Sequence, residues 1–361
     1  MRPTSRRNFL RSTSGAALAV GTFPLLAWDE ACQRTNLTTA QLQAFRTSIG
    51  CTVVYPIDTA YDQLRVGYNL RFAHFPMMIV QPTTLDHVKA AIAFASEHGI
   101  TLTAKGGGHS YCGWSYCDGM VLDFSQMKAI AFGTGNETVT IQPGAILIEM
   151  YEALSCQAQC GLPGGTCPTV GIPGYTLGGG YGPYSRPFGF MCDRLRRVTM
   201  VKADGTHLEA AVGGPNEHIL KACRGGGGGS FGIITEFEFE PFQVNQVAQT
   251  GVNASSFEEA AGFFEVLQGF APEIQAEATF MGSIYASPNF QGVGASVYGV
   301  PDASHDAQTV AMNNANELKH QMVKNGVSVQ NIPPAINMTI ARMALKTGFP
   351  IDSDLSDPTN P

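Results

Sequence analysis

One glycine-rich stretch decides how this chain is organised, and it reads Lys105-Gly106-Gly107-Gly108-His109-Ser110-Tyr111-Cys112-Gly113. Successive glycines permit positive φ angles and a close approach of the backbone to a ligand, and their N–H groups can form a nest for an anion such as a diphosphate. The apolar segments 100–104 and 120–124, which flank the stretch, are typical of strands. The sequence therefore predicts a tight, ligand-holding loop within a sheet, with Lys105 adding positive charge at its mouth and His109 as its first reactive side chain.

The same residues carry a resemblance to a known family. Gly107-Gly108-His109-Ser110-Tyr111 resembles the flavin-attachment loop of the berberine bridge enzyme-like oxidases, in the vanillyl-alcohol oxidase and para-cresol methylhydroxylase (PCMH) superfamily. The resemblance implies that His109 is bonded to the 8α-methyl group of FAD and that the neighbouring glycines contact its diphosphate. Relatives usually carry arginine where this chain has Lys105, so the charge is kept but the bidentate fork is not.

A second glycine-rich segment, residues 164–182, is predicted to be an extended loop pressed against something flat, because its composition suits neither a helix nor a regular strand. It resembles the second flavin segment of the same family, and the resemblance implies a bond from Cys167 to C6 of the isoalloxazine ring. A thiolate is the species that adds to the electrophilic ring, so the site is expected to favour that form. The alternative is a buried structural cysteine. The motif residues are Cys167-Pro168-Thr169-Val170-Gly171 and Gly178-Gly179-Gly180.

Two features of this segment leave alternatives open. Many relatives have Gly-Gly-His where this chain has Pro173-Gly174-Tyr175; Pro173 removes one N–H group, and Tyr175 either replaces the histidine as a hydrogen-bonding group or packs. In the family, a valine at the position of Val170 goes with reactivity of the flavin toward O₂. The resemblance therefore favours an oxidase, and the alternative for Val170 is a packing role.

A third glycine run, residues 224–232, resembles the Arg-Gly-Gly-Gly-x-x-Phe-Gly signature that lies against FAD in the family. It does not predict a Rossmann site, because a Gly-x-Gly-x-x-Gly match inside polyglycine is trivial and no acidic residue follows a helix at the required distance. Besides His109 and Cys167, the resemblance implies the following cofactor-binding residues: Lys105, Gly106, Gly107, Gly108, Ser110, Tyr111, Gly113, Thr169, Val170, Gly171, Gly174, Gly178, Gly179, Gly180, Gly182, Gly232 and Ile234.

The composition bounds the class of protein. A length of 361 residues predicts two domains, and the net charge of −7 without any basic run argues against a nucleic-acid partner. Beyond the N-terminal segment, no apolar run reaches the roughly 18–20 residues of a membrane span. The nine cysteines show no convincing zinc spacing, so no metal is expected. Cys112, Cys117, Cys156 and Cys160 are either disulfide-bonded or plain buried thiols, and the odd total leaves at least one cysteine unpaired or used for chemistry.

The N-terminal segment 1–28 is predicted to be a twin-arginine signal, because it contains Ser5-Arg6-Arg7-Asn8-Phe9-Leu10-Arg11 followed by the mild apolar run 15–27. The alternative is an ordinary amphipathic first helix. This route exports folded proteins with their cofactor inserted, so we expect a periplasmic or extracellular flavoprotein. The cleavage site and the retention of the segment as an anchor stay open.

The resemblance implies an α+β fold: a PCMH-type FAD-binding domain of two α/β subdomains over residues 70–245, and a partial substrate domain over 246–345, an antiparallel sheet backed by helices. A disordered tail is expected over 346–361. Hydrophobic patterns and caps predict strands over 77–81, 120–123, 138–142, 194–203, 233–239, 276–285 and 292–300, and helices over 84–98, 146–160, 215–223, 255–270 and 302–325.

The implied function is that of an FAD-dependent oxidoreductase, which passes a hydride from an alcohol, sugar or secondary metabolite to covalently bound FAD, with O₂ as acceptor. The chain ends before the residues that carry the family's active-site tyrosine and base, so no catalytic residue is assigned. Tyr111 either faces the substrate or packs against the flavin. Two alternatives remain: a truncated FAD-binding protein that is inactive as an oxidase, and a glycine-rich periplasmic protein without flavin. The substrate and the oligomeric state stay open.

Overall fold

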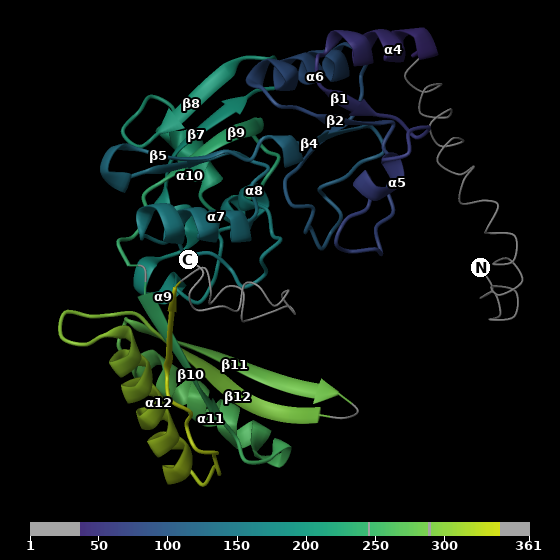
Figure 1. Ribbon diagram of the computed structural model, residues 1–361. Helices are drawn as coiled ribbons and strands as arrows, with labels where there is room; N and C mark the ends of the chain where they lie inside the picture. The colour runs from purple at the N-terminus through teal and green to yellow at the C-terminus, as the bar shows by residue number, and fades with distance from the viewer. Residues whose placement is uncertain (1–36, 245, 288–289, 340–361) are drawn as a thin grey trace, which may run out of the picture.

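The computed structural model describes residues 37–244, 246–287 and 290–339. They form three β-sheets, each with helices packed against it (Figure 1). This arrangement confirms the predicted α+β fold. The predicted signal segment 1–28 and the predicted tail 346–361 lie outside the described residues.

The first sheet holds the strands on either side of the first glycine loop, in the order β1-β2-β4-β3. Strands β2 and β3 run parallel to β4, and β1 is antiparallel to β2. Helices α4 and α6 pack against this sheet in one buried cluster. The elements are α4 (Thr39–Ser48), β1 (Thr52–Val54), α5 (Tyr61–Leu64), β2 (Met78–Gln81), α6 (Leu85–Glu97), β3 (Leu102–Lys105) and β4 (Met120–Asp123).

Helix α6 begins where the sequence predicts. The hydroxyl of Thr84 accepts a hydrogen bond from the backbone N–H of His87, a cap that stabilises a helix by about 1 kcal/mol. Val88, Ala91, Ile92 and Ala95 recur at helical spacing and are buried against the sheet. This packing fixes the edge of the sheet from which the first glycine loop leaves.

The second sheet is antiparallel throughout, in the order β5-β6-β9-β7-β8. The predicted turn at Asp204-Gly205 joins β7 to β8: Lys202 N–H donates to Thr206 O over 2.9 Å, and Gly205 has a φ of 78°. The elements are β5 (Ile130–Phe132), β6 (Val139–Ile141), α7 (Leu147–Ala153), α8 (Ile172–Leu177), α9 (Ser185–Phe188), β7 (Leu195–Val201), β8 (His207–Ala211), α10 (Glu217–Cys223) and β9 (Ile233–Phe239).

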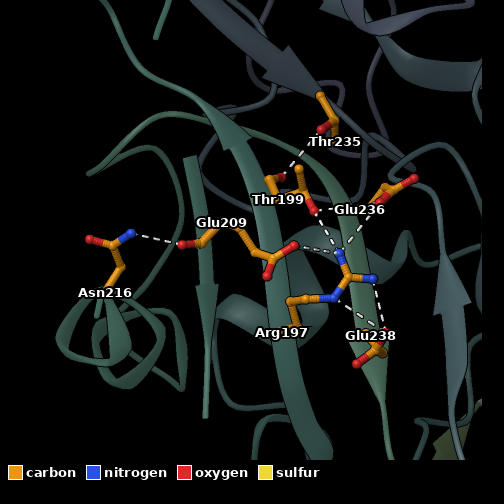
Figure 2. A network of polar contacts seen from close by, with 7 residues as sticks. All are labelled: Arg197, Thr199, Glu209, Asn216, Thr235, Glu236 and Glu238. Atoms are coloured by element: carbon orange, nitrogen blue, oxygen red, sulfur yellow. Dashed lines mark hydrogen bonds and ion pairs between the residues drawn. The ribbon is translucent and has the colours of Figure 1, made fainter. Parts of the chain in front are cut away.

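One face of the second sheet carries a polar network centred on Arg197 of β7 (Figure 2). Its guanidinium lies 2.9 Å from Glu238, 3.4 Å from Glu209 and 3.8 Å from Glu236, on the neighbouring strands β9 and β8. Three carboxylates thus surround one cation on a partly exposed surface. The adjacent residue, Val198, points to the opposite face and lies in the core.

The third sheet, in the order β11-β12-β10-β13, is covered on one face by α11 and α12 (Figure 1). Tyr298, near the end of β12, and Val300, just after it, belong to the buried cluster of the second sheet. Arg186 donates to the carbonyls of Ala271 and Ile274. The second and third sheets are therefore packed together. The elements are β10 (Gln246–Asn253), α11 (Ala260–Phe270), β11 (Ala278–Ser287), β12 (Phe290–Gly299), α12 (Ala307–Lys324) and β13 (Ile336–Thr339). Within the described ranges, no helix is long and apolar enough to cross a membrane.

Two predictions of local structure are wrong. Residues 172–177 are not extended but form α8, because Pro173 stands in its first turn, where no N–H is needed, and Ile172 and Leu177 are buried in the core. The helix predicted over 146–160 ends at Ala153 and continues as a short π-helix, Leu154–Ala158. In addition, β10 was not predicted as a strand; half of its residues are polar and they do not alternate strictly with the apolar ones.

Candidate cofactor-binding site

The first glycine loop leaves β3 and carries His109 to a defined position. The imidazole Nε2 lies 2.8 Å from the hydroxyl of Thr169, and the ring stacks on Tyr68 with the two centroids 4.4 Å apart. Partial burial lowers the pKa of His109 below its ordinary value. The site thus favours the neutral imidazole, which keeps a free lone pair.

The first loop and the second glycine-rich segment touch through their backbones. A Cβ atom on Gly107 would lie 2.4 Å from the nitrogen of Gly171, and one on Gly171 would lie 2.2 Å from the nitrogen of Gly107. Both distances are far shorter than any real Cβ contact, so only glycine fits at either position. The His109 loop and the Cys167 segment therefore lie side by side, as the resemblance requires.

The Cys167 segment is anchored on the helical side of the second sheet. Ile148 N–H donates to Pro168 O and Leu147 N–H to Val170 O, each over 2.9 Å. Cys167 itself is a half-buried free thiol, and Val170 packs partly buried against the core. The packing role of Val170 is thus observed, and its effect on O₂ reactivity stays a prediction.

Tyr175 and Gly180 shape the second half of this segment. The hydroxyl of Tyr175 lies 3.0 Å from Pro163 O and 2.8 Å from Tyr181 O, so it ties the segment to itself. Gly180 has a φ of 77°, and a Cβ there would lie 2.4 Å from that of Met191. Tyr175 thus makes hydrogen bonds within its own segment and also packs partly buried against the core. Its replacement of the family's histidine stays a prediction.

The third glycine run meets the second segment at Leu177, whose carbonyl accepts a 2.7 Å hydrogen bond from Gly227 N–H. At its end, Gly232 lies against β7, since a Cβ there would come within 2.7 Å of Val201 O. Ile234, in β9, pairs with Met200 of β7. The structure therefore brings the second and third runs together, and the third run ends where β9 begins, among the central strands of the second sheet.

Lys105 differs from the sequence expectation. Its ammonium does not point to the mouth of the loop but lies 3.1 Å from Asp123 Oδ2 and 3.2 Å from Leu64 O, with the side chain only 13% exposed. The reason is the parallel register of β3 and β4, which places Lys105 directly beside Asp123. Burial lowers the pKa of Lys105, but the nearby Asp123 carboxylate and Tyr116 outweigh burial and raise it, so the ammonium stays charged.

Free backbone donors test whether FAD fits this site. In the described part of the chain, the N–H groups of residues 107–112 and of 228–231 donate no hydrogen bond to other protein groups. Successive free N–H groups in glycine-rich turns are the donors that bind phosphate oxygens. The two runs thus fit a cofactor that carries a diphosphate.

The remaining residues of the first loop hold its far end. The hydroxyl of Ser110 accepts a 3.1 Å hydrogen bond from Trp114 N–H, and Gly113 lies tightly against Phe72. Tyr111 is 70% exposed, with its ring 5.9 Å from that of Tyr68. Its two alternative roles, facing a substrate or packing on the flavin, both stay predictions.

Sequence reasoning missed Tyr68 and Asp123. Nothing in the local sequence around Tyr68 signals its stacking on His109. Asp123 did leave a signal, because an acidic residue directly ends the apolar strand β4 and is fully buried there.

The cysteines within the described ranges are free thiols, and the same ranges contain no group of three or more His, Cys, Asp or Glu side chains that could hold a metal ion. For these residues the structure favours plain thiols over disulfides. Cys32 lies outside the described residues.

Comparison with known proteins agrees with this geometry. Residues 76–211 match a family described as FAD binding domain. This region is an FAD-binding domain. It contains the His109 loop and the whole Cys167 segment, and the third glycine run follows it in the chain.

Relatives of the chain include FAD-linked oxidases and berberine bridge enzyme-like proteins. This chain is 34% identical over 248 residues to the aclacinomycin-N/aclacinomycin-A oxidase of Streptomyces galilaeus. The alignment covers 65% of this chain and 45% of that protein. Among solved structures, the Physcomitrella patens BBE-like 1 protein superposes with a TM-score of 0.71 at 27% identity, over 82% of this chain and 62% of that one.

A glucooligosaccharide oxidase from Acremonium strictum superposes with a TM-score of 0.75 at 25% identity, over 88% of this chain and 64% of that one. That structure is described by its 6-S-cysteinyl, 8α-N1-histidyl FAD. The family resemblance and the PCMH-type fold inferred from the sequence are thereby confirmed. The chain spans about half the length of the curated relatives it matches.

Proposed function

We propose that the protein is an FAD-dependent oxidoreductase that holds its cofactor covalently through His109 and Cys167. The observation that carries this proposal is the 2.8 Å contact between His109 Nε2 and the hydroxyl of Thr169, two residues beyond Cys167. When bound, FAD would act as the acceptor of a hydride from a carbon that bears oxygen or nitrogen. The double linkage named for the glucooligosaccharide oxidase supports the same pair of attachments here.

The contacts of His109 indicate how it would be attached. Thr169 engages Nε2, which leaves Nδ1 as the nitrogen for the new bond, and the lowered pKa keeps the ring neutral. On FAD, His109 would supply Nδ1 for a C–N bond and Cys167 its sulfur for a C–S bond. Each residue would give up one hydrogen, and O₂ would take up the two protons and two electrons released by each linkage as hydrogen peroxide.

The substrate class is proposed from the relatives. One is named as an oxidase of aclacinomycins and another as an oxidase of glucooligosaccharides, so we propose an alcohol, a sugar or a secondary metabolite as substrate and O₂ as acceptor. Tyr111 and Tyr181, 70% and 62% exposed, offer flat apolar faces next to the glycine segments. Oxygen consumption with a panel of oligosaccharides and glycosylated alcohols tests this part, and no consumption with any of them would contradict it.

Acid precipitation tests the attachment. Wild-type protein is precipitated with acid, the pellet is washed, and its absorption in the flavin region is recorded. His109→Ala and Cys167→Ala should each retain acid-stable flavin through the other residue, and the double variant should lose it. His320→Ala and Cys156→Ala, exposed residues outside the glycine segments, are the matched controls. Acid-stable flavin in the double variant would show that both assignments are wrong.

Export by the twin-arginine route belongs to the same proposal and rests on Arg6 and Arg7. Replacing both with lysine should retain the protein in the cytoplasm, as measured by cell fractionation. Unchanged export of the double lysine variant would contradict this part of the proposal.

A further inference from the structure

The ammonium of Lys105 lies beneath the first glycine loop, and two of its three donors face oxygen atoms of the protein. A lysine ammonium has three N–H donors; here one faces Asp123 Oδ2, one faces Leu64 O, and the Tyr116 ring lies 5.4 Å away. Asp123 is fully buried and Lys105 nearly so. This cation therefore acts inside the protein rather than on a ligand above the loop.

Tyr116 extends the contact from Lys105 to the loop. Its hydroxyl donates to Val66 O over 2.8 Å, and its ring packs so closely on Gly67 that a Cβ there would lie 2.8 Å away. The same hydroxyl would lie 3.0 Å from a Cβ on Gly108, the residue before His109. Lys105 and Tyr116 thus hold segment 64–68 against the underside of the loop.

Segment 64–68 ends at Tyr68, which contacts His109 directly. Tyr68 N–H donates to Gly108 O over 3.1 Å, and its ring is stacked on the imidazole with an interplanar angle of 20°. A continuous set of contacts therefore runs from the buried Lys105–Asp123 pair through segment 64–68 to the ring of His109.

We propose that Lys105 is a positioning residue for His109: together with Asp123 and Tyr116 it fixes segment 64–68, which holds Tyr68 over the imidazole. The inference rests on the proposed attachment of FAD through His109. Forming a bond to a ring nitrogen requires the ring to be held in one orientation, and a misplacement of an ångström is costly in rate. Lys105 supplies the rigid base, and Tyr68 fixes the plane of the ring.

Single-tether proteins test the proposal. In the Cys167→Ala background His109 is the only attachment residue, and in the His109→Ala background Cys167 is. Flavin-free protein is mixed with FAD in air, and acid-stable flavin is followed with time. Lys105→Met and Tyr68→Ala should slow attachment on the order of 100-fold in the Cys167→Ala background and leave it unchanged in the His109→Ala background.

Two variants serve as controls. Lys128→Met removes a lysine that pairs with Glu149 on the surface, with the lysine side chain 57% exposed, and should change neither rate. Tyr68→Phe keeps the ring and should attach flavin at the parent rate. Equal slowing of Lys105→Met in both backgrounds would mean general damage to the site, and no slowing in either would remove the positioning role; both results overturn the proposal.

A second measurement separates this inference from the proposed function. In flavin-free protein, the NMR chemical shifts of the His109 ring protons depend on the aromatic ring of Tyr68 stacked on them. Tyr68→Ala and Lys105→Met should shift these signals in the same direction, and Lys128→Met should not. If no variant or parent ever attaches flavin, the proposed function fails, while unshifted His109 signals in Lys105→Met overturn the positioning role on their own.

Discussion

Two cations, Lys105 and Arg197, lie on strands of neighbouring sheets and differ in their surroundings. Lys105, at the end of β3, pairs with one fully buried carboxylate, that of Asp123. Arg197, in the middle of β7, meets Glu209, Glu236 and Glu238 on a face where these carboxylates are 24% to 59% exposed (Figure 2). A count of ion pairs would rank Arg197 as the more important residue.

The physical chemistry reverses that ranking. An exposed ion pair stabilises a protein by about 0–1 kcal/mol because water and salt screen it. Removing one partner of a buried pair costs about 3–5 kcal/mol, because the other charge is left uncompensated. The buried pair also lies beneath the His109 loop, whereas no predicted cofactor residue takes part in the Arg197 network. Burial, rather than the number of contacts, marks the cation that supports the site.

The largest expected effect is that of Asp123→Ala, which leaves the ammonium of Lys105 buried without its carboxylate. The free energy of unfolding should fall by about 3–5 kcal/mol, as measured by urea denaturation. The double variant Lys105→Met/Asp123→Leu, an apolar pair of similar volume, should recover most of this loss. If Asp123→Ala lowered the free energy of unfolding by less than about 1 kcal/mol, the Lys105–Asp123 pair would contribute no more to stability than the exposed ion pairs of Arg197.

Gly107→Ala should have the next largest effect, because its Cβ would collide with the backbone of Gly171. Forcing the two loops apart should cost about 1–3 kcal/mol of unfolding free energy and remove acid-stable flavin. Gly269→Ala in α11, where a Cβ meets nothing within 4 Å, is the control. Wild-type stability and flavin content in Gly107→Ala would show that the loops do not depend on this contact.

Arg197→Met should cost only about 1 kcal/mol or less, and the difference should shrink in high salt because the carboxylates around it are partly exposed. Acid-stable flavin should be unchanged. A loss as large as that of Asp123→Ala, or a loss of flavin, would break the contrast between the two cations.

The smallest effect concerns the protonation of His109, whose ring is only partly buried. Its folded-state pKa is lowered, so the unfolded chain binds the proton more readily. The stability of the wild type should therefore fall, relative to His109→Gln, as the pH drops below the unfolded pKa of about 6.5, and level off below the folded pKa. At pH values above the unfolded pKa, the difference in unfolding free energy between the wild type and His109→Gln should stay constant. A wild type that gains stability on acidification, relative to His109→Gln, would reverse the sign expected from burial.

Local sequence was enough to predict much of the fold and the three glycine segments. The Thr84 cap of α6 and the Asp204-Gly205 turn depend on contacts between residues that are close in sequence, so both could be predicted from local sequence patterns. The glycine segments are visible because their composition excludes regular structure. The prediction was wrong for α8, where burial of Ile172 and Leu177 outweighs the low helix propensity of a glycine-rich, proline-containing stretch.

The parts that could not be predicted depend on long-range contacts. The direction of Lys105 is set by Asp123, on the next strand of the sheet, and by Leu64, 41 positions earlier in the sequence. Tyr68 reaches His109 across a similar separation, and no local pattern marks either residue for this role. The glycine-rich segments could thus be recognised from the sequence, whereas the residues that hold them in place are seen only when the sheets are assembled.

The backbone contact between Gly107 and Gly171 has a consequence for folding. It joins the first sheet to the segment that packs on the second, and no side chain of either residue can substitute for it. The loop that must close runs from residue 107 to residue 171, and closing a loop of this length is slow because its conformational entropy is lost before the contact forms. Partly folded chains therefore lack the assembled site, and a cofactor that binds only the assembled site stabilises the completed fold by mass action.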